Sequence, residues 1–251
     1  MTAAPHLQVR ATAEPVDPIP TGAISRRMTE TNLARATASP GKLQLWIEWS
    51  VLFIGVPVLM LAFLGQYSLF LTVWMLAAIA ALLLWMTPGF QWGDLWRPIS
   101  RRGWWTLLGF SAATLAVTLS TVLLLVPERL FELPLHRTGL WVMIMLLYPP
   151  VSAWPQELIF RTLFFERYGR LFPNAAVAIA VNGAAFAFGH LFFQNWVTIA
   201  MTGLAGAVIG WAYLYDRSLW LSWALHSLGG MIVFSSGLGI FFYHGVIGAT
   251  P

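Results

Sequence analysis

Residues 104–126 read WWTLLGFSAATLAVTLSTVLLLV, and this stretch contains no charged side chain. A helix of roughly 20 apolar residues crosses the ~30 Å hydrocarbon core of a bilayer, and only a helix satisfies all its own backbone groups there. The stretch therefore predicts a transmembrane helix. The whole chain is 58% hydrophobic and only 10% charged, a composition that fits no soluble globular class.

Apolar runs of similar length lie on both sides of this stretch. We expect an all-α, polytopic membrane protein with seven to eight transmembrane helices. The seven expected spans lie near residues 46–64, 68–86, 104–126, 140–165, 174–193, 197–215 and 219–236. A last apolar segment, residues 237–248, is too short for an ordinary crossing. It is expected to form either a short eighth span or a re-entrant end.

The N-terminal residues 1–42 differ in kind from the rest, since they are rich in Pro, Ala, Thr and Arg and contain no long apolar run. We expect a disordered cytoplasmic tail there, followed by a helical transmembrane domain over residues 43–251. The first apolar segment starts late and lacks a small-residue cleavage site. It therefore reads as a retained span and not as a signal peptide.

The basic residues predict the orientation, because Lys and Arg accumulate in short cytoplasmic loops. One expected side collects Arg10, Arg26, Arg27, Arg35, Lys42, Arg97, Arg101, Arg102, Arg167, Arg170 and Arg217. The other side has only Arg129 and Arg137, offset by Glu128 and Glu132. We therefore expect a cytoplasmic N-terminus. The expected location is the bacterial inner (plasma) membrane, where the basic surface would face anionic lipid of the bilayer, and no nucleic-acid partner is expected.

Ionisable residues inside the expected spans are few, and each costs roughly 2.5–3.5 kcal/mol at the centre of a span. They are Glu48, Glu157, Arg161, His190 and His226. Glu157 and Arg161 are four residues apart, so they share one helix face and can form an ion pair. Such a pair alone is more often structural than catalytic, and a single buried histidine is more often a hydrogen-bonded structural residue.

The span that contains Glu157 also contains Pro149, Pro150 and Pro155. Proline removes a backbone donor and bends or breaks a helix. Irregular backbone at membrane depth is tolerated where it is buried in protein or lines a watery cavity. The prolines and Glu157 therefore both predict a cavity at this point of the span. Small residues in the next two spans, Gly183 and Gly203 among them, predict close helix packing.

Glu157, His190 and His226 come from three different spans and fit two kinds of chemistry. The glutamate can act as a general base on water, with a histidine as orienter or oxyanion donor, and this chemistry requires no cofactor. Alternatively, the trio can hold a divalent metal such as zinc, with one position open for water. The absence of cysteine excludes disulfides, thiolate catalysis and Cys-type metal sites.

Three motifs in this order resemble those of the CAAX protease and bacteriocin-processing family (CPBP, also called Abi) of intramembrane proteases, which includes the Ras-converting CaaX endopeptidases. The family's EExxxR corresponds to QELIFR at Gln156–Arg161, FxxxH to FAFGH at Phe186–His190, and HxxxN to HSLGG at His226–Gly230. The resemblance covers about residues 140–245, which we call the family-like core. The first three spans match the family only in being apolar.

The resemblance implies that His190 assists a water-activating residue and that His226 stabilises the oxyanion. Two positions depart from the family pattern. Gln156 stands where the family has the activating glutamate, and it cannot take up a proton at neutral pH. Gly230 stands where the family has an oxyanion-binding Asn. Glu157 is adjacent, but successive helical residues point about 100° apart, so it replaces the lost base only where the kinked backbone turns it inward.

We therefore expect an intramembrane endopeptidase, glutamic or metal-dependent, that hydrolyses a peptide bond of a membrane protein or peptide substrate. Glu157, His190 and His226 would surround the water, Gln156 would position substrate or water, and Arg161 would pair with Glu157. The alternative is a catalytically degenerate family member that binds a membrane protein as an immunity or assembly factor. A transporter would show paired broken helices, and only one span here is clearly broken.

Overall fold

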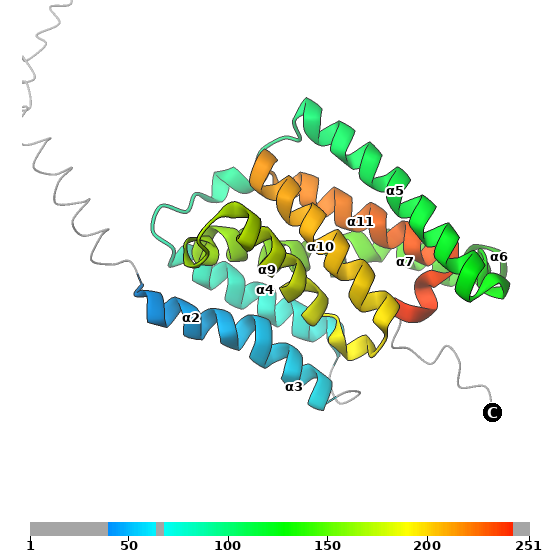
Figure 1. Cartoon of the computed structure of the whole chain (residues 1–251), viewed down its shortest axis with the longest axis horizontal. Helices are drawn as coiled ribbons and strands as arrows, with labels where there is room; N and C mark the ends of the chain where they lie inside the picture. The colour runs from blue at the N-terminus through cyan, green and yellow to red at the C-terminus, as the bar shows by residue number, and fades with distance from the viewer. Residues whose placement is uncertain (1–39, 64–67, 243–251) are drawn as a thin grey trace, which may run out of the picture. The chain divides into compact units, whose positions relative to one another are not determined.

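The computed structural model describes residues 40–63 and 68–242, and across them every regular element is helical. This confirms the all-α expectation for that part of the chain (Figure 1). The expected disordered tail lies outside the described residues up to residue 39, and helix α2 begins at Lys42. Of the last apolar segment, a 3₁₀ helix, η8 (Leu238–Phe242), is described.

The longer helical segments follow the expected spans closely. They are α2 (Lys42–Ser50) continued by η1 (Val51–Gly55) and α3 (Val56–Ala62), α4 (Leu69–Trp85), α5 (Arg101–Leu125), α7 (Thr138–Leu147) continued by η4 (Tyr148–Ala153), α8 (Trp154–Glu157) and η5 (Leu158–Tyr168), α9 (Ala175–Phe188), α10 (Trp196–Asp216) and α11 (Leu219–Ser236). The short connecting helices are η2 (Trp92–Trp96), η3 (Pro127–Arg129), α6 (Glu132–His136), η6 (Gly169–Leu171) and η7 (Leu191–Phe193).

Four of the described helices are long and apolar enough to cross a membrane. They cover Lys42–Ala62, Arg101–Leu125, Ala175–Phe193 and Trp196–Asp216, and α4 is a shorter apolar helix. These helices support an integral membrane protein. That all seven expected ranges cross the bilayer, and that the N-terminus is cytoplasmic, stay predictions.

Side-chain caps fix where several of these helices begin. The side chains of Ser68, Ser100, Asn174, Asn195 and Ser218 accept hydrogen bonds from backbone N–H groups in the first turns of α4, α5, α9, α10 and α11. The first N–H groups of a helix have no partner within it, so such caps satisfy donors that would otherwise be left free.

Small residues bring α9 and α10 into close contact, as the sequence predicts. A Cβ on Gly183 would lie 2.9 Å from the carbonyl oxygen of Gly203, and one on Gly206 would lie 3.0 Å from the Cβ of Phe186. Helix α10 also packs on α11, and α11 packs on α5; Figure 1 shows α9, α10, α11 and α5 running side by side. Helix α11, which contains the third motif, also packs on α8 and η5, which contain the first.

The helix from Thr138 to Tyr168 is irregular where the prolines lie, with wide π-helical turns in η4 and η5. Pro155 has no N–H to offer to the carbonyl of Val151, and Nε1 of Trp74 donates to that oxygen instead, at 2.9 Å. Nε1 of Trp223 donates to the carbonyl of Pro149 at 2.7 Å. Indole donors from α4 and α11 therefore stabilise the widened backbone and fix its position between them.

Arg167, which the sequence places in a loop, is instead buried at the end of η5. Its guanidinium forms two hydrogen bonds with Glu48, at 2.7 and 3.0 Å, and also donates to the Leu83 carbonyl and the Thr87 hydroxyl. One arginine thus joins the first helix and α4 to η5. The buried ion pair accounts for Glu48, which is therefore structural.

We expect Arg167→Ala to lower the free energy of unfolding by about 3 kcal/mol, because it leaves the largely buried Glu48 carboxylate without its partner. Unfolding in detergent micelles, followed by tryptophan fluorescence, measures the change. Arg97→Ala is the control, since the pair that Arg97 forms with Asp94 is half exposed and should contribute less than about 1 kcal/mol. Equal effects of the two variants would contradict the assignment.

Candidate active site

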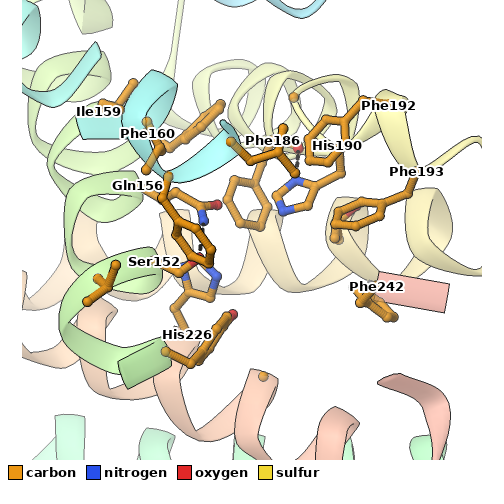
Figure 2. A pocket seen from close by; sticks show the side chains of 18 of the residues that line it. Ser152, Gln156, Ile159, Phe160, Phe186, His190, Phe192, Phe193, His226 and Phe242 are labelled. Carbon is orange, nitrogen blue, oxygen red and sulfur yellow. Dashed lines mark hydrogen bonds between the residues drawn. The ribbon is translucent and has the colours of Figure 1, made fainter. Parts of the chain in front are cut away.

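The three motif segments meet at one cavity with a volume of about 700 Å³. Gln156 on α8, His190 directly after α9 and His226 on α11 all line it, and Figure 2 shows these side chains around the same space. The structure therefore brings together three residues that the sequence singled out on three separate spans.

Most of the cavity wall is apolar. Aliphatic and aromatic side chains from nearly every long helix line it, among them Met60, Phe70, Val73, Ile144, Leu163, Met201 and Phe234. The polar side chains in the wall are Thr114, Tyr148, Ser152, Gln156, His190, Thr202 and His226. Several of these polar groups belong to the three motif segments, so the cavity combines a large apolar volume with a small polar region.

Glu157 reaches the cavity through His226. Its side chain is fully buried and does not line the cavity, and its Oε1 lies 2.8 Å from Nδ1 of His226. An ionised carboxylate only accepts hydrogen bonds, so beside such a carboxylate a neutral His226 donates from Nδ1 and has its lone pair on Nε2. The sequence led us to expect Glu157 beside the water itself; the structure instead places an imidazole between the carboxylate and the cavity.

The expected pair between Glu157 and Arg161 is present within the buried core. Nε of Arg161 lies 3.3 Å from Oε2 of Glu157, and neither side chain is exposed. The guanidinium also donates to Oδ1 of Asn182 at 2.8 Å and lies over the ring of Phe186, 4.8 Å from its centre. The two oxygens of Glu157 are therefore shared between one histidine and one arginine.

Asn182 is a site residue that the motif analysis missed. It is fully buried on α9, where Oδ1 accepts from Arg161 and Nδ2 donates to the Phe160 carbonyl at 2.6 Å. Gly210 on α10 leaves room for it, because a Cβ there would lie 2.7 Å from Oδ1 of Asn182. The available signal was a lone amide in the otherwise apolar, small-residue run of α9.

His190 is held by its own turn. Its Nδ1 lies 2.8 Å from the carbonyl oxygen of Phe186, which can only accept, so Nδ1 carries the proton and Nε2 has the lone pair. The Phe186 ring packs edge-on against both histidines, with centres 4.6 Å from His190 and 5.3 Å from His226. Phe186 therefore fixes the positions of both imidazoles.

Gln156 lines the cavity at the position of the family's first glutamate. Its Nε2 donates to Oγ of Ser152, one turn earlier, at 3.0 Å, as the dashed line in Figure 2 marks. Of the adjacent pair, Gln156 thus faces the cavity and Glu157 faces the protein interior. The 100° step between neighbouring helical residues accounts for this division.

The described residues provide no set of ligands for the divalent metal site that was the alternative expectation. Across residues 40–63 and 68–242, no three side chains of His, Cys, Asp or Glu are grouped so that they could hold a metal ion. The Glu157 carboxylate is already bound by Nδ1 of His226 and faced by Arg161. These side chains do not fit a zinc site of the His, His and Glu type, so we derive no step through a metal.

The fold and the cavity define a helical membrane protein in which a buried carboxylate contacts a histidine at the wall of a largely apolar cavity. Residues 136–232 match the family model for type II CAAX prenyl endopeptidases, described as Rce1-like. The match supports membership of this part of the chain in the CAAX protease family, as the three motifs indicate. Comparisons with curated proteins and with solved structures gave no match.

Proposed function

We propose that the protein is an intramembrane endopeptidase in which His226, oriented by Glu157, removes a proton from the water that attacks a peptide carbonyl. The observation that carries this proposal is the 2.8 Å contact between Nδ1 of His226 and the buried Glu157 carboxylate. Because the same imidazole lines the cavity, its other nitrogen is available to a water molecule there.

The proposed reaction has two steps. In the first, Nε2 of His226 accepts a proton from water as the water oxygen bonds to the carbonyl carbon, and the Glu157 carboxylate stabilises the imidazolium that forms. In the second, the imidazolium gives the proton to the leaving nitrogen as the C–N bond breaks, which yields a new carboxyl end and a new amine. A positioned general base of this kind contributes roughly 10²- to 10⁴-fold to the rate.

Arg161 and Asn182 support this proposal by holding the carboxylate in place. The guanidinium faces Oε2 of Glu157, and Asn182 holds the guanidinium. A carboxylate that orients histidine without itself taking the proton performs the same task in Ser-His-Asp sites. Glu157 and Arg161 are therefore assigned as positioning residues.

His190 and Gln156 are proposed to bind the reactants. Nε2 of His190 is a hydrogen-bond acceptor, since Nδ1 donates to the Phe186 carbonyl, and it would hold the second hydrogen of the water. The Gln156 amide has a free carbonyl oxygen beside its bond to Ser152, and it would accept from a backbone N–H of the substrate. Neither role requires Gln156 to take up a proton.

The proposed substrate is a membrane-associated protein or peptide with an apolar segment or group next to the bond that is cut. The mainly apolar wall of the cavity would remove such a group from water. The matched family model is that of prenyl endopeptidases, so a prenylated peptide is one candidate of this class. We also propose a location in the bacterial inner membrane, and the placement of Lys and Arg along the sequence supports a cytoplasmic N-terminus.

The test uses the full chain in lipid nanodiscs and a panel of defined peptides. The panel contains a farnesylated CaaX peptide, its unmodified counterpart and a library of apolar peptides, with products read by mass spectrometry. We expect the wild-type protein to cleave at least one peptide and His226→Ala to cleave none. The proposal fails if no peptide is cut, or if both proteins cut the same peptide at the same rate.

Binding without cleavage is the second candidate function, and Gln156 is the observation that favours it. A glutamine lines the cavity where the family has its activating glutamate, and its amide is bonded to Ser152. Such a protein would bind a membrane peptide as an immunity or assembly factor. In the panel above it would retain peptides without producing fragments, and Gln156→Glu would be expected to start cleavage.

A further inference from the structure

The ring of Tyr148 fills the space beside Gly230 in the third motif. A Cβ placed on Gly230 would overlap Cε1, Cζ and the hydroxyl oxygen of Tyr148. Any residue other than glycine at position 230 would therefore displace this ring. Gly230 therefore removes the Asn side chain of the third motif and also makes room for the phenol ring of Tyr148.

Tyr148 is well placed to act on a substrate. It is the first residue of η4, where the backbone widens before Pro149, and its side chain lines the cavity. The ring packs edge-on against His226, at 5.9 Å between centres, and against Phe234, at 5.6 Å. The phenol therefore lies beside the imidazole that we assign as the base.

The two histidines of the motif segments present acceptors, and not donors, to the cavity. Nε2 of His226 and Nε2 of His190 have lone pairs, because the Nδ1 protons are used elsewhere. One of the two N–H groups of the Gln156 amide is bonded to Ser152. A phenolic hydroxyl, in contrast, has a proton to donate, and a developing oxyanion needs a donor.

We infer that Tyr148 is a further catalytic residue, whose hydroxyl donates a hydrogen bond to the carbonyl oxygen of the bond being cut. As water adds to the carbon, that oxygen gains negative charge, and the phenol stabilises it without transferring its proton. When the C–N bond breaks, the carbonyl re-forms and the proton held by His226 leaves with the amine. This inference rests on the proposed endopeptidase function.

Tyr148→Phe tests the inference, because it keeps the ring and its contacts with His226 and Phe234 and removes only the hydroxyl. Removing one oxyanion donor typically lowers kcat about 10²- to 10³-fold. We expect a fall of that size with KM changed less than about twofold, measured with the peptide that wild type cleaves fastest in nanodiscs. The thermal midpoint should match that of wild type.

Tyr213→Phe is the matched control, since its hydroxyl bonds to Glu166 at 3.2 Å and it does not line the cavity. It should keep the wild-type kcat. If Tyr148→Phe also keeps kcat, or raises KM alone, Tyr148 is not an oxyanion donor, and the endopeptidase proposal stands without it. If the wild-type protein cleaves no peptide of the panel, the endopeptidase proposal fails. The proposed role of Tyr148 then fails as well.

Discussion

Glu157→Gln is expected to lower kcat about 10³- to 10⁴-fold, the loss seen when the carboxylate that orients a catalytic histidine becomes an amide. The amide can present an N–H to Nδ1 of His226, which favours the wrong tautomer and moves the proton to Nε2. His226 would then face the cavity with a donor and could not accept a proton from water. Steady-state cleavage of the fastest peptide, in nanodiscs, measures the effect.

The same change at Glu166 is the control for this prediction. Glu166 lies on the same helix and pairs with Arg217 at 2.7 Å, where both side chains are partly exposed. Glu166→Gln should therefore leave kcat within about twofold, because exposed pairs contribute little. If Glu157→Gln retained more than a tenth of the wild-type kcat, Glu157 would not orient the base.

Arg161→Met is expected to lower the free energy of unfolding by about 3–5 kcal/mol, the usual cost of removing one partner of a buried ion pair. The reason is that Glu157 would keep a fully buried charge with only His226 beside it. Activity should fall with stability, since the carboxylate would lose its fixed position. Unfolding in detergent micelles and peptide cleavage are measured on the same preparation.

A double variant separates the charge effect from a simple loss of packing. Glu157→Gln combined with Arg161→Met removes both charges, so it should be more stable than Arg161→Met alone while staying inactive. A double variant as unstable as the sum of its two single variants would show that the two residues are not coupled. The buried charge of Glu157 would then not explain the loss.

The positions of the helices were largely predictable from the sequence because long uncharged runs admit few structures in a bilayer. Residues 104–126, for example, lie almost entirely within α5. The ion pair of Glu157 and Arg161 was also predictable, because a spacing of four residues places both on one helix face. Both inferences depend only on residues that are close in sequence.

Contacts between distant helices could not be predicted in this way. Whether Gln156 or Glu157 faces the cavity depends on how α8 packs against α11, and only the structure gives the contact between Glu157 and His226. Arg167 was expected in a loop because the apolar run was taken to end near residue 165, whereas the structure pairs it with Glu48 on the first helix. From the sequence alone, Gly230 indicates only that the oxyanion-binding Asn of the family is missing. The structure shows that the ring of Tyr148 occupies the space beside this glycine.

Cleavage in H₂¹⁸O tests the central claim most directly, because the claim is that water held by His226 attacks a peptide bond. Wild-type protein in nanodiscs should produce fragments whose new carboxyl end contains one ¹⁸O atom, and His226→Ala should produce none. Mass spectrometry of the fragments distinguishes these results. No fragment from wild type, or equal labelled fragment from His226→Ala, would contradict the account.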